Sequence, residues 1–180
     1  METRSRLPGV WPGGYRVIEY QVGESGQVLV FSDAVLEHFR RHRQTRLWQK
    51  EAGGQLFARF TLPRIMVEEA TGPRRTDHRT RTSYSADRAA EQREIVERHT
   101  RGLHFIGDWH THPETRPSPS SQDDHSIAEC FARSTHGLNA FVLVIVGIAA
   151  LPETLYVAVH SAELTSRLAP RELLAPSSTR

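Results

Sequence analysis

The sequence has almost no cysteine or lysine, and it has no long apolar run. Among its 180 residues, Cys130 is the one cysteine and Lys50 is the one lysine. A single cysteine excludes an intrachain disulfide and a cysteine-based zinc finger. The apolar stretch Ala140–Leu151 is too short to span a membrane, and the first 14 residues lack the apolar core of a signal peptide. We therefore expect a soluble cytoplasmic protein that does not insert into a membrane.

The charge of the chain is nearly balanced, with 23 basic and 21 acidic residues and a formal net charge of +2 at pH 7. That balance gives nucleic acid no general electrostatic attraction, so we do not expect it as a partner. The chain length suits one domain with a sizeable core. We expect a flexible leader at residues 1–14, one domain at residues 15–165 and a polar C-terminal tail at residues 166–180.

Strand and helix patterns alternate irregularly along the chain. Ser32 or Asp33 can cap a helix that extends to Trp48, because apolar residues recur at positions 35, 36, 39 and 47. The polar segment 74–88 has no period of its own and is predicted to be a loop. Further helices are predicted at residues 86–102 and 119–137, and strands at 15–22, 26–32, 51–62, 64–73, 103–112, 140–148 and 154–164. This order predicts an α/β fold with a central mixed β-sheet flanked by helices.

The stretch GDWHTHPETRPSPSSQDD, residues 107–124, carries the most unusual residue pattern. Side chains alternate along a strand, so His110 and His112 point to one face and Trp109 to the other, where it joins the core. Prolines then end the strand, because they cannot continue its hydrogen bonds. Ser120 opens the next helix, and Asp123 lies in its first turn, where it can reach the two imidazoles.

Two neutral imidazoles and one carboxylate form a three-ligand zinc site that leaves one position open for water, as catalytic sites do. Zinc lowers the pKa of such a water to about 7 and supplies a nucleophile at neutral pH. The reaction also needs a general base that is not bound to the metal. Glu51 in the sequence EAGG is the candidate, since Gly53 and Gly54 leave room for another backbone beside it.

Each of these features also has an ordinary structural explanation. Two alternating histidines are usually packed or solvated side chains, and EAGG is compatible with a turn. Ser120 and Asp123 match a helix-capping pair, which needs no metal. The occurrence of all the features in this order favours the metal site.

With the pattern H-T-H-P-(x)6-S-x-x-D and the upstream EAGG, the chain resembles the JAMM (JAB/MPN) zinc metalloproteases. The resemblance spans residues 28–159 and implies a single-domain, cytidine-deaminase-like fold. It implies a hydrolase that cleaves isopeptide or peptide bonds next to ubiquitin or ubiquitin-like proteins. It also implies that His110, His112 and Asp123 bind Zn²⁺, that Glu51 is the acid/base, and that Ser120 donates a hydrogen bond to the oxyanion.

A narrower resemblance rests on ATGP, DHRTRTSYSAD and GDWHTHPE, which are similar to short bacterial JAMM proteins encoded in anti-phage, CBASS-type operons. That similarity implies an isopeptidase that reverses conjugation of a ubiquitin-like protein or of a CD-NTase through its C-terminal tail, with E1/E2-like enzymes as pathway partners. The residues QLFA after EAGG depart from the family's usual LLG. Two alternatives stay open: a peptidase that processes a precursor, and a non-catalytic MPN scaffold. The RadC-type proteins associated with DNA repair are disfavoured, because the chain lacks their HNHPSG sequence.

Three further residues are candidates beside this set. Asp108 shares the strand face of the two histidines and can orient an imidazole, although an exposed strand acid is equally compatible. Arg79 and Arg81 lie in the polar segment, where arginines are usually solvated, and can instead steer a substrate tail into the cleft. We expect that tail to be extended against a sheet edge and to be rich in small residues such as glycine.

Overall fold

The computed structural model describes residues 17–171, so the expected leader at 1–14 and residues 172–180 of the expected tail lie outside it. In chain order the elements are β1 (Ile18–Val22), β2 (Gln27–Phe31), α1 (Asp33–His42), β3 (Gly53–Thr61), β4 (Arg64–Ala70), β5 (His78–Arg79), β6 (Tyr84–Ser85), α2 (Arg88–Thr100), β7 (His104–Thr111), α3 (Ser121–Arg133), β8 (Phe141–Val146), β9 (Leu155–His160) and β10 (Thr165–Arg167). Within the described range, no helix combines the length and apolar content needed to cross a membrane.

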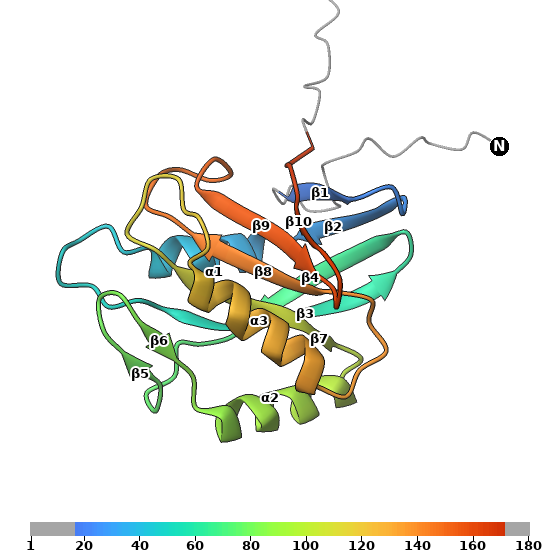
Figure 1. The fold of residues 1–180 in the computed structure, drawn as a ribbon, viewed down its shortest axis with the longest axis horizontal. Coiled ribbons are helices and arrows are strands. Elements are labelled where there is room, and N and C mark those ends of the chain that lie inside the picture. The colour runs from blue at the N-terminus through green and yellow to red at the C-terminus, as the bar shows by residue number, and fades with distance from the viewer. Residues whose placement is uncertain (1–16, 172–180) are drawn as a thin grey trace, which may run out of the picture.

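One mixed sheet organises the fold (Figure 1), with the strand order β1-β2-β4-β3-β7-β8-β9-β10. The pairs β2–β4 and β7–β8 are parallel, and the other pairs of the sheet are antiparallel. A bridge between Tyr20 of β1 and Pro170 brings the residues that follow β10 next to β1. Leu168 is buried there, three residues past the expected domain boundary at 165. The mixed α/β fold expected from the sequence is confirmed.

Helices cover both faces of this sheet and create two cores. On one face, Val35, Leu36 and Phe39 of α1 pack in the same cluster as Trp109. On the other face, Ile127 of α3 packs in a cluster with apolar residues of β8 and β9. Trp109 is 1% exposed, and its ring lies 5.3 Å from that of Phe39. The prediction that Trp109 belongs to the core is confirmed.

Helix α1 is shorter than predicted, because it ends at His42 rather than near Trp48. Its apolar stripe stops after Phe39: the next positions on that face are the polar residues His42, Arg43 and Arg46, of which His42 still packs its ring 5.7 Å from that of Trp109. The chain leaves the helix at Arg43, which has an extended ψ of 138°. Residues 43–50 form a surface turn instead.

The segment 74–88, predicted to be a loop, contains the short hairpin β5–β6. A buried polar network fixes this hairpin on α2. The Arg74 guanidinium donates to Glu94 at 2.8 and 2.5 Å, and the Asp77 carboxylate accepts the backbone N–H of Asp87 at 2.9 Å. The prediction missed these strands because their two-residue paired stretches are too short and polar to show a period-two pattern.

A β-bulge in β7 changes which residues face α3. The pairing with β3 shifts between Gly107 and Phe105, so Ile106 is the extra residue. Gly107 has φ of 142°, a conformation that favours glycine. Phe105 therefore packs on the α3 face and Ile106 on the α1 face. Simple alternation from His110 would have placed Ile106, rather than Phe105, on the face of the two candidate ligands.

Candidate metal centre

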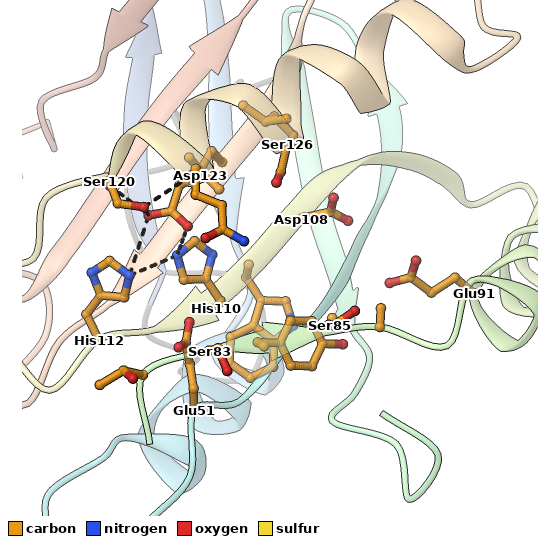
Figure 2. Close-up of a pocket in the computed structure, with 18 of the residues that line it drawn as sticks. Glu51, Ser83, Ser85, Glu91, Asp108, His110, His112, Ser120, Asp123 and Ser126 are labelled. Atoms are coloured by element: carbon orange, nitrogen blue, oxygen red, sulfur yellow. Dashed lines mark hydrogen bonds and ion pairs between the residues drawn. The ribbon is translucent and has the colours of Figure 1, made fainter. Parts of the chain in front are cut away.

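His110 is the second-last residue of β7, and His112 follows the end of the strand. Both imidazoles lie on the side opposite Trp109, and their Nε2 atoms are 3.2 Å apart. Figure 2 shows the two rings next to each other, facing the start of α3. His110 is buried and His112 is half-buried. The strand thus brings two nitrogen donors to one point, as the spacing His-x-His predicts.

Asp123 reaches the imidazoles from the first turn of α3. Its Oδ1 lies 3.2 Å from Nε2 of His110, and its Oδ2 lies 3.6 Å from Nε2 of His112. Helix α3 begins with a capping box, in which Ser120 accepts the backbone N–H of Asp123 at 3.2 Å and the Asp123 side chain accepts that of Ser120 at 2.7 Å. The cap fixes the carboxylate and therefore accounts for its position beside the rings.

The three side chains lie at distances that fit a tetrahedral metal ion. Nε2 of His110 is 3.2 Å from Nε2 of His112 and 3.2 Å from Oδ1 of Asp123, and Nε2 of His112 is 3.6 Å from the other carboxylate oxygen, Oδ2. Zinc bonds to nitrogen and oxygen are about 2.0–2.1 Å long, which places two tetrahedral ligands about 3.3–3.4 Å apart. The lone pairs of two imidazoles and a carboxylate repel one another at such distances unless a cation or protons lie between them. The residues present therefore fit a zinc ion with three protein ligands.

Glu51 completes the cluster from a different part of the chain. Its carboxylate and the two imidazoles offer ligand atoms that all lie within 4.8 Å of one another. Glu51 lies two residues before β3 rather than on the strand, a correction to the sequence prediction. Its backbone is held by the segment next to β5, since its N–H donates to the Thr80 carbonyl at 2.8 Å and its carbonyl accepts from Arg79 Nε at 2.5 Å. This clamp fixes Glu51 without using its carboxylate.

The glycines after Glu51 allow a second segment of backbone to approach. A Cβ atom at Gly54 would overlap the carbonyl of Thr71, and a Cβ atom at Gly53 would lie 2.6 Å from the Tyr84 ring. The sequence EAGG predicts room for another backbone at this point. The approaching backbone is that of Thr71 and Gly72, which belong to the chain itself.

We expect Gly54→Ala to destabilise the protein by at least about 2 kcal/mol, because the clash is with backbone that cannot rotate away. Chemical denaturation measures this change. Gly137→Ala is the matched control, since a Cβ atom at Gly137 meets nothing within 4 Å. Equal unfolding free energies for the two variants would show that Thr71 shifts at little cost.

The surroundings move the pKa values of these groups in different directions. The pKa of Glu51 is raised to about 7: burial has the largest effect and raises it, His110 lowers it, Asp123 raises it and Arg79 lowers it. Burial also raises the pKa of Asp123, but contacts with His110 and Ser120 outweigh it, so that this pKa lies well below its usual value. Burial lowers the pKa of His112, and His110 lowers it further. Asp123 is thus a permanent anion, while Glu51 exchanges a proton near neutral pH.

Ser120 is engaged with Asp123 in this structure. Its hydroxyl donates to Oδ2 of Asp123 at 2.8 Å while accepting the Asp123 N–H. A hydroxyl has one proton to donate, so it cannot serve the carboxylate and an oxyanion at the same time. The structural explanation raised for Ser120 and Asp123, a capping pair, is confirmed, and it is compatible with metal binding by Asp123.

A cleft of about 440 Å³ extends away from these residues. One wall is the stretch Thr82–Ala86 around β6, and the other is the start of α3 from Ser120 to Ile127. Figure 2 shows Glu51, His110, His112 and Asp123 at one end of the cleft, and Asp108 and Glu91 toward the other. A volume of this size accommodates several residues of an extended peptide.

The three remaining candidates are arranged differently from the metal cluster. Asp108 lines the cleft, and burial raises its pKa to about 7, but no hydrogen bond within residues 17–171 joins it to either imidazole. The guanidinium of Arg79 donates to the carbonyls of Glu51 and Lys50. That of Arg81 donates to the carbonyls of Arg46 and Leu47. Both arginines therefore fasten the segment before Glu51.

Sequence reasoning missed a polar connection behind the metal centre. Thr111, between the two histidines, donates its hydroxyl to the buried Gln44 side chain at 2.9 Å and accepts the N–H of Ala52 at 3.0 Å. These bonds join β7 to the segment that carries Glu51. The sequence shows only that Thr111 points away from the two histidines. It does not show the hydrogen-bond partners of Thr111, because Gln44 and Ala52 are distant along the chain.

Comparison with known proteins assigns the fold to a family. Residues 32–161 match the family described as prokaryotic homologs of the JAB domain. A solution structure of a protein from Desulfitobacterium hafniense aligns over 73% of this chain and 84% of its own, with a TM-score of 0.54 and 19% identity. At that identity the likeness concerns the fold alone.

Two similar proteins carry the name "CD-NTase/cGAS isopeptidase". The protein from Pseudomonas aeruginosa is 34% identical over 99 residues, which are 53% of this chain and 63% of that relative. The protein from Vibrio cholerae is 30% identical over 127 residues, which are 69% of this chain and 79% of that relative. The match thus spans less than two thirds of the Pseudomonas protein.

Proposed function

Because the chain belongs to the prokaryotic JAB family, we propose that it is a zinc-dependent isopeptidase that removes a protein conjugated through its C-terminal tail. One observation carries the proposal: His110, His112 and Asp123 converge at the spacing of tetrahedral ligands, with Glu51 beside them at the end of a cleft. We infer the class of reaction, hydrolysis, from the family, and the mechanism from the side chains of the site.

We assign the zinc ligands as His110, His112 and Asp123, and we keep Glu51 off the metal. A fourth protein ligand would close the site, whereas three leave a position for water. The low pKa of Asp123 suits a permanent anionic ligand, and the pKa of Glu51, raised to about 7, suits a group that takes up and returns a proton. When bound, zinc lowers the pKa of water and polarises the scissile carbonyl.

Glu51 then performs both proton transfers of the hydrolysis. Its carboxylate accepts a proton from the water that attacks the scissile carbonyl carbon. It later gives that proton to the amine nitrogen as the carbon–nitrogen bond breaks, so that the products are a free carboxylate on the tail and a free amine on the target. The clamp from Arg79 and Thr80 to the Glu51 backbone keeps the carboxylate at hydrogen-bonding range during both transfers.

The shape of the cleft supports an extended C-terminal tail as the substrate. Within residues 17–171, strand β6 pairs only with β5, so its other edge, along the cleft, is available to pair with an extended peptide. The side chains that line this wall are mostly small, and include Ser83, Ser85 and Ala86. An extended tail with small residues next to the scissile bond matches these features. The names of the relatives favour a CD-NTase as the conjugated protein, which would place E1/E2-like enzymes upstream in the pathway.

Cleavage of model conjugates tests the proposal. A CD-NTase of the source bacterium is joined through its C-terminal residue to a fluorescent protein, either as a linear fusion or through a lysine isopeptide bond. We expect zinc-dependent cleavage immediately after the tail, loss of cleavage on chelation, and recovery on adding zinc. Faster cleavage of the linear fusion would favour the precursor-processing alternative. No cleavage of either conjugate by zinc-loaded protein would favour the scaffold.

Ser120→Ala is expected to lower kcat by about 10²-fold, because we propose that the hydroxyl turns its proton from Asp123 to the oxyanion once the substrate is bound. It also removes a helix cap, which costs about 1 kcal/mol of stability. Ser32→Ala is the matched control, since Ser32 caps α1 by accepting the Val35 N–H and lies outside the cleft. We expect the two variants to lose similar stability while only Ser120→Ala loses turnover. An unchanged kcat would limit Ser120 to the cap.

A further inference from the structure

The turn between α1 and β3 presents two large apolar side chains to solvent. Leu47 is 79% exposed and Trp48 is 74% exposed. Single exposed apolar residues are common on protein surfaces, but two adjacent ones that include a tryptophan leave a large area unburied. Tryptophan is also among the residues that contribute most to binding at protein interfaces.

Hydrogen bonds fix the backbone conformation of this turn. The Gln49 side chain accepts the backbone N–H of Arg46 at 2.8 Å. The buried Gln44 side chain donates to the Arg81 carbonyl at 2.8 Å, and the Arg81 guanidinium donates to the Leu47 carbonyl. The backbone is therefore held at several points while both apolar side chains stay outside, so their exposure is a property of the fold.

Three cations of the turn and its anchor form no ion pair within residues 17–171: Arg46, Lys50 and Arg81. The Arg46 guanidinium lies over the Trp48 ring, 5.3 Å from its centroid. The sequence contains no acidic residue between Glu37 and Glu51. The turn is thus an uncompensated positive surface with an apolar centre.

We propose that this surface, which we call the docking turn and define as Arg46, Leu47, Trp48, Lys50 and Arg81, binds an acidic surface with an apolar depression on the folded body of the conjugated protein. The inference rests on the proposed function, because it concerns the protein whose tail enters the cleft. Lys50 is followed directly by Glu51, so a protein seated on the docking turn lies at the catalytic end of the cleft. A second contact of this kind raises the effective concentration of the tail at the site.

Two substrates separate docking from chemistry. The first is the folded CD-NTase fused through its tail to a fluorescent protein, and the second is a short peptide of the same tail fused to the same reporter. For the double variant Leu47→Ala/Trp48→Ala we expect kcat/KM on the folded substrate to fall by at least about 10-fold, mainly through KM. Cleavage of the peptide fusion should stay unchanged. Leu62→Ala, which truncates another exposed leucine (66% exposed) beyond the far end of β3, should leave both reactions unchanged.

Charge provides an independent arm of the test. Arg46→Glu/Lys50→Glu should weaken the reaction with the folded substrate alone, and added salt should reduce the advantage of the folded substrate over the peptide. Equal losses on both substrates would overturn the docking role, because they would place the effect at the cleft. An advantage of the folded substrate that is independent of salt would overturn the acidic character of its surface.

A binding measurement keeps this inference separate from the proposed hydrolysis. Affinity for the folded CD-NTase is measured with Glu51→Gln and with Glu51→Gln/Trp48→Ala, neither of which needs to cleave. We expect at least about 10-fold weaker binding for the second chain. Equal affinities, or no binding by either, would overturn the docking turn. Trp48-dependent binding without cleavage by the wild-type chain would overturn the hydrolysis and leave the docking turn in place.

Discussion

Replacing Glu51 with glutamine is expected to lower kcat by about 10²–10⁴-fold while zinc stays bound. Glutamine has nearly the same shape as glutamate but cannot accept a proton from water at neutral pH. The bonds that fix Glu51 involve its backbone, through Thr80 and Arg79, so the variant keeps its position. Steady-state cleavage of the tail fusion gives kcat, and elemental analysis of the same sample gives zinc per chain.

Glu114→Gln is the control for Glu51→Gln. Glu114 also lines the cleft, but it is exposed, and its carboxylate accepts the backbone N–H of Ser118. We expect it to retain turnover. Loss of zinc from Glu51→Gln would make Glu51 a ligand, an arrangement that its closeness to both imidazoles also permits. Full activity with zinc bound would exclude Glu51 as the base.

Asp123→Ala is expected to remove both zinc and turnover. The change deletes one of the three proposed ligands and half of the capping box of α3. A ligand that binds only the folded state at 100 times its Kd stabilises the protein by about 2.7 kcal/mol. Zinc should therefore raise the Tm of the wild-type chain by several degrees and leave that of Asp123→Ala unchanged. Thermal unfolding with and without zinc measures the difference.

Asp124→Ala is the matched control for Asp123→Ala. Asp124 is the next residue of the same first turn, with the same favourable relation to the helix dipole, and it is exposed and outside the cleft. It should keep zinc, the rise in Tm and turnover. A variant Asp123→Ala that binds zinc as tightly as the wild type would reduce Asp123 to a helix cap.

The position of the candidate ligands was predictable because each depends on local geometry. Alternation along a strand places His110 and His112 together, and a proline turn followed by a cap places Asp123 one element later. The resemblance carried by the same residues pointed to the JAB family, and the match to residues 32–161 agrees with it. The roles of the ligands, of Glu51 and of Ser120 stay predictions until zinc and turnover are measured.

Features that depend on contacts between distant segments were not predictable. The bulge at Ile106 exchanges the faces of Phe105 and Ile106, and nothing in a single strand sequence marks the register of its neighbour. Arg79 and Arg81 read as free charges in a polar segment, yet both bind main-chain carbonyls some 30 residues earlier in the chain. A guanidinium can donate to a carboxylate, an amide or a main-chain carbonyl. The sequence therefore does not show which oxygen atoms an arginine binds.

The attachment of Arg79 and Arg81 to main-chain oxygens has a consequence for how such enzymes diverge. Every amino acid has the same main-chain carbonyl. Substitutions at Leu47, Trp48 or Lys50 therefore preserve the hydrogen bonds that Arg79 and Arg81 donate to the backbone of this turn and of Glu51. The surface of this turn is therefore free to change during evolution while the chemistry is retained. Homologues that serve different target proteins are expected to vary most in these side chains and least in the two arginines that hold their backbone.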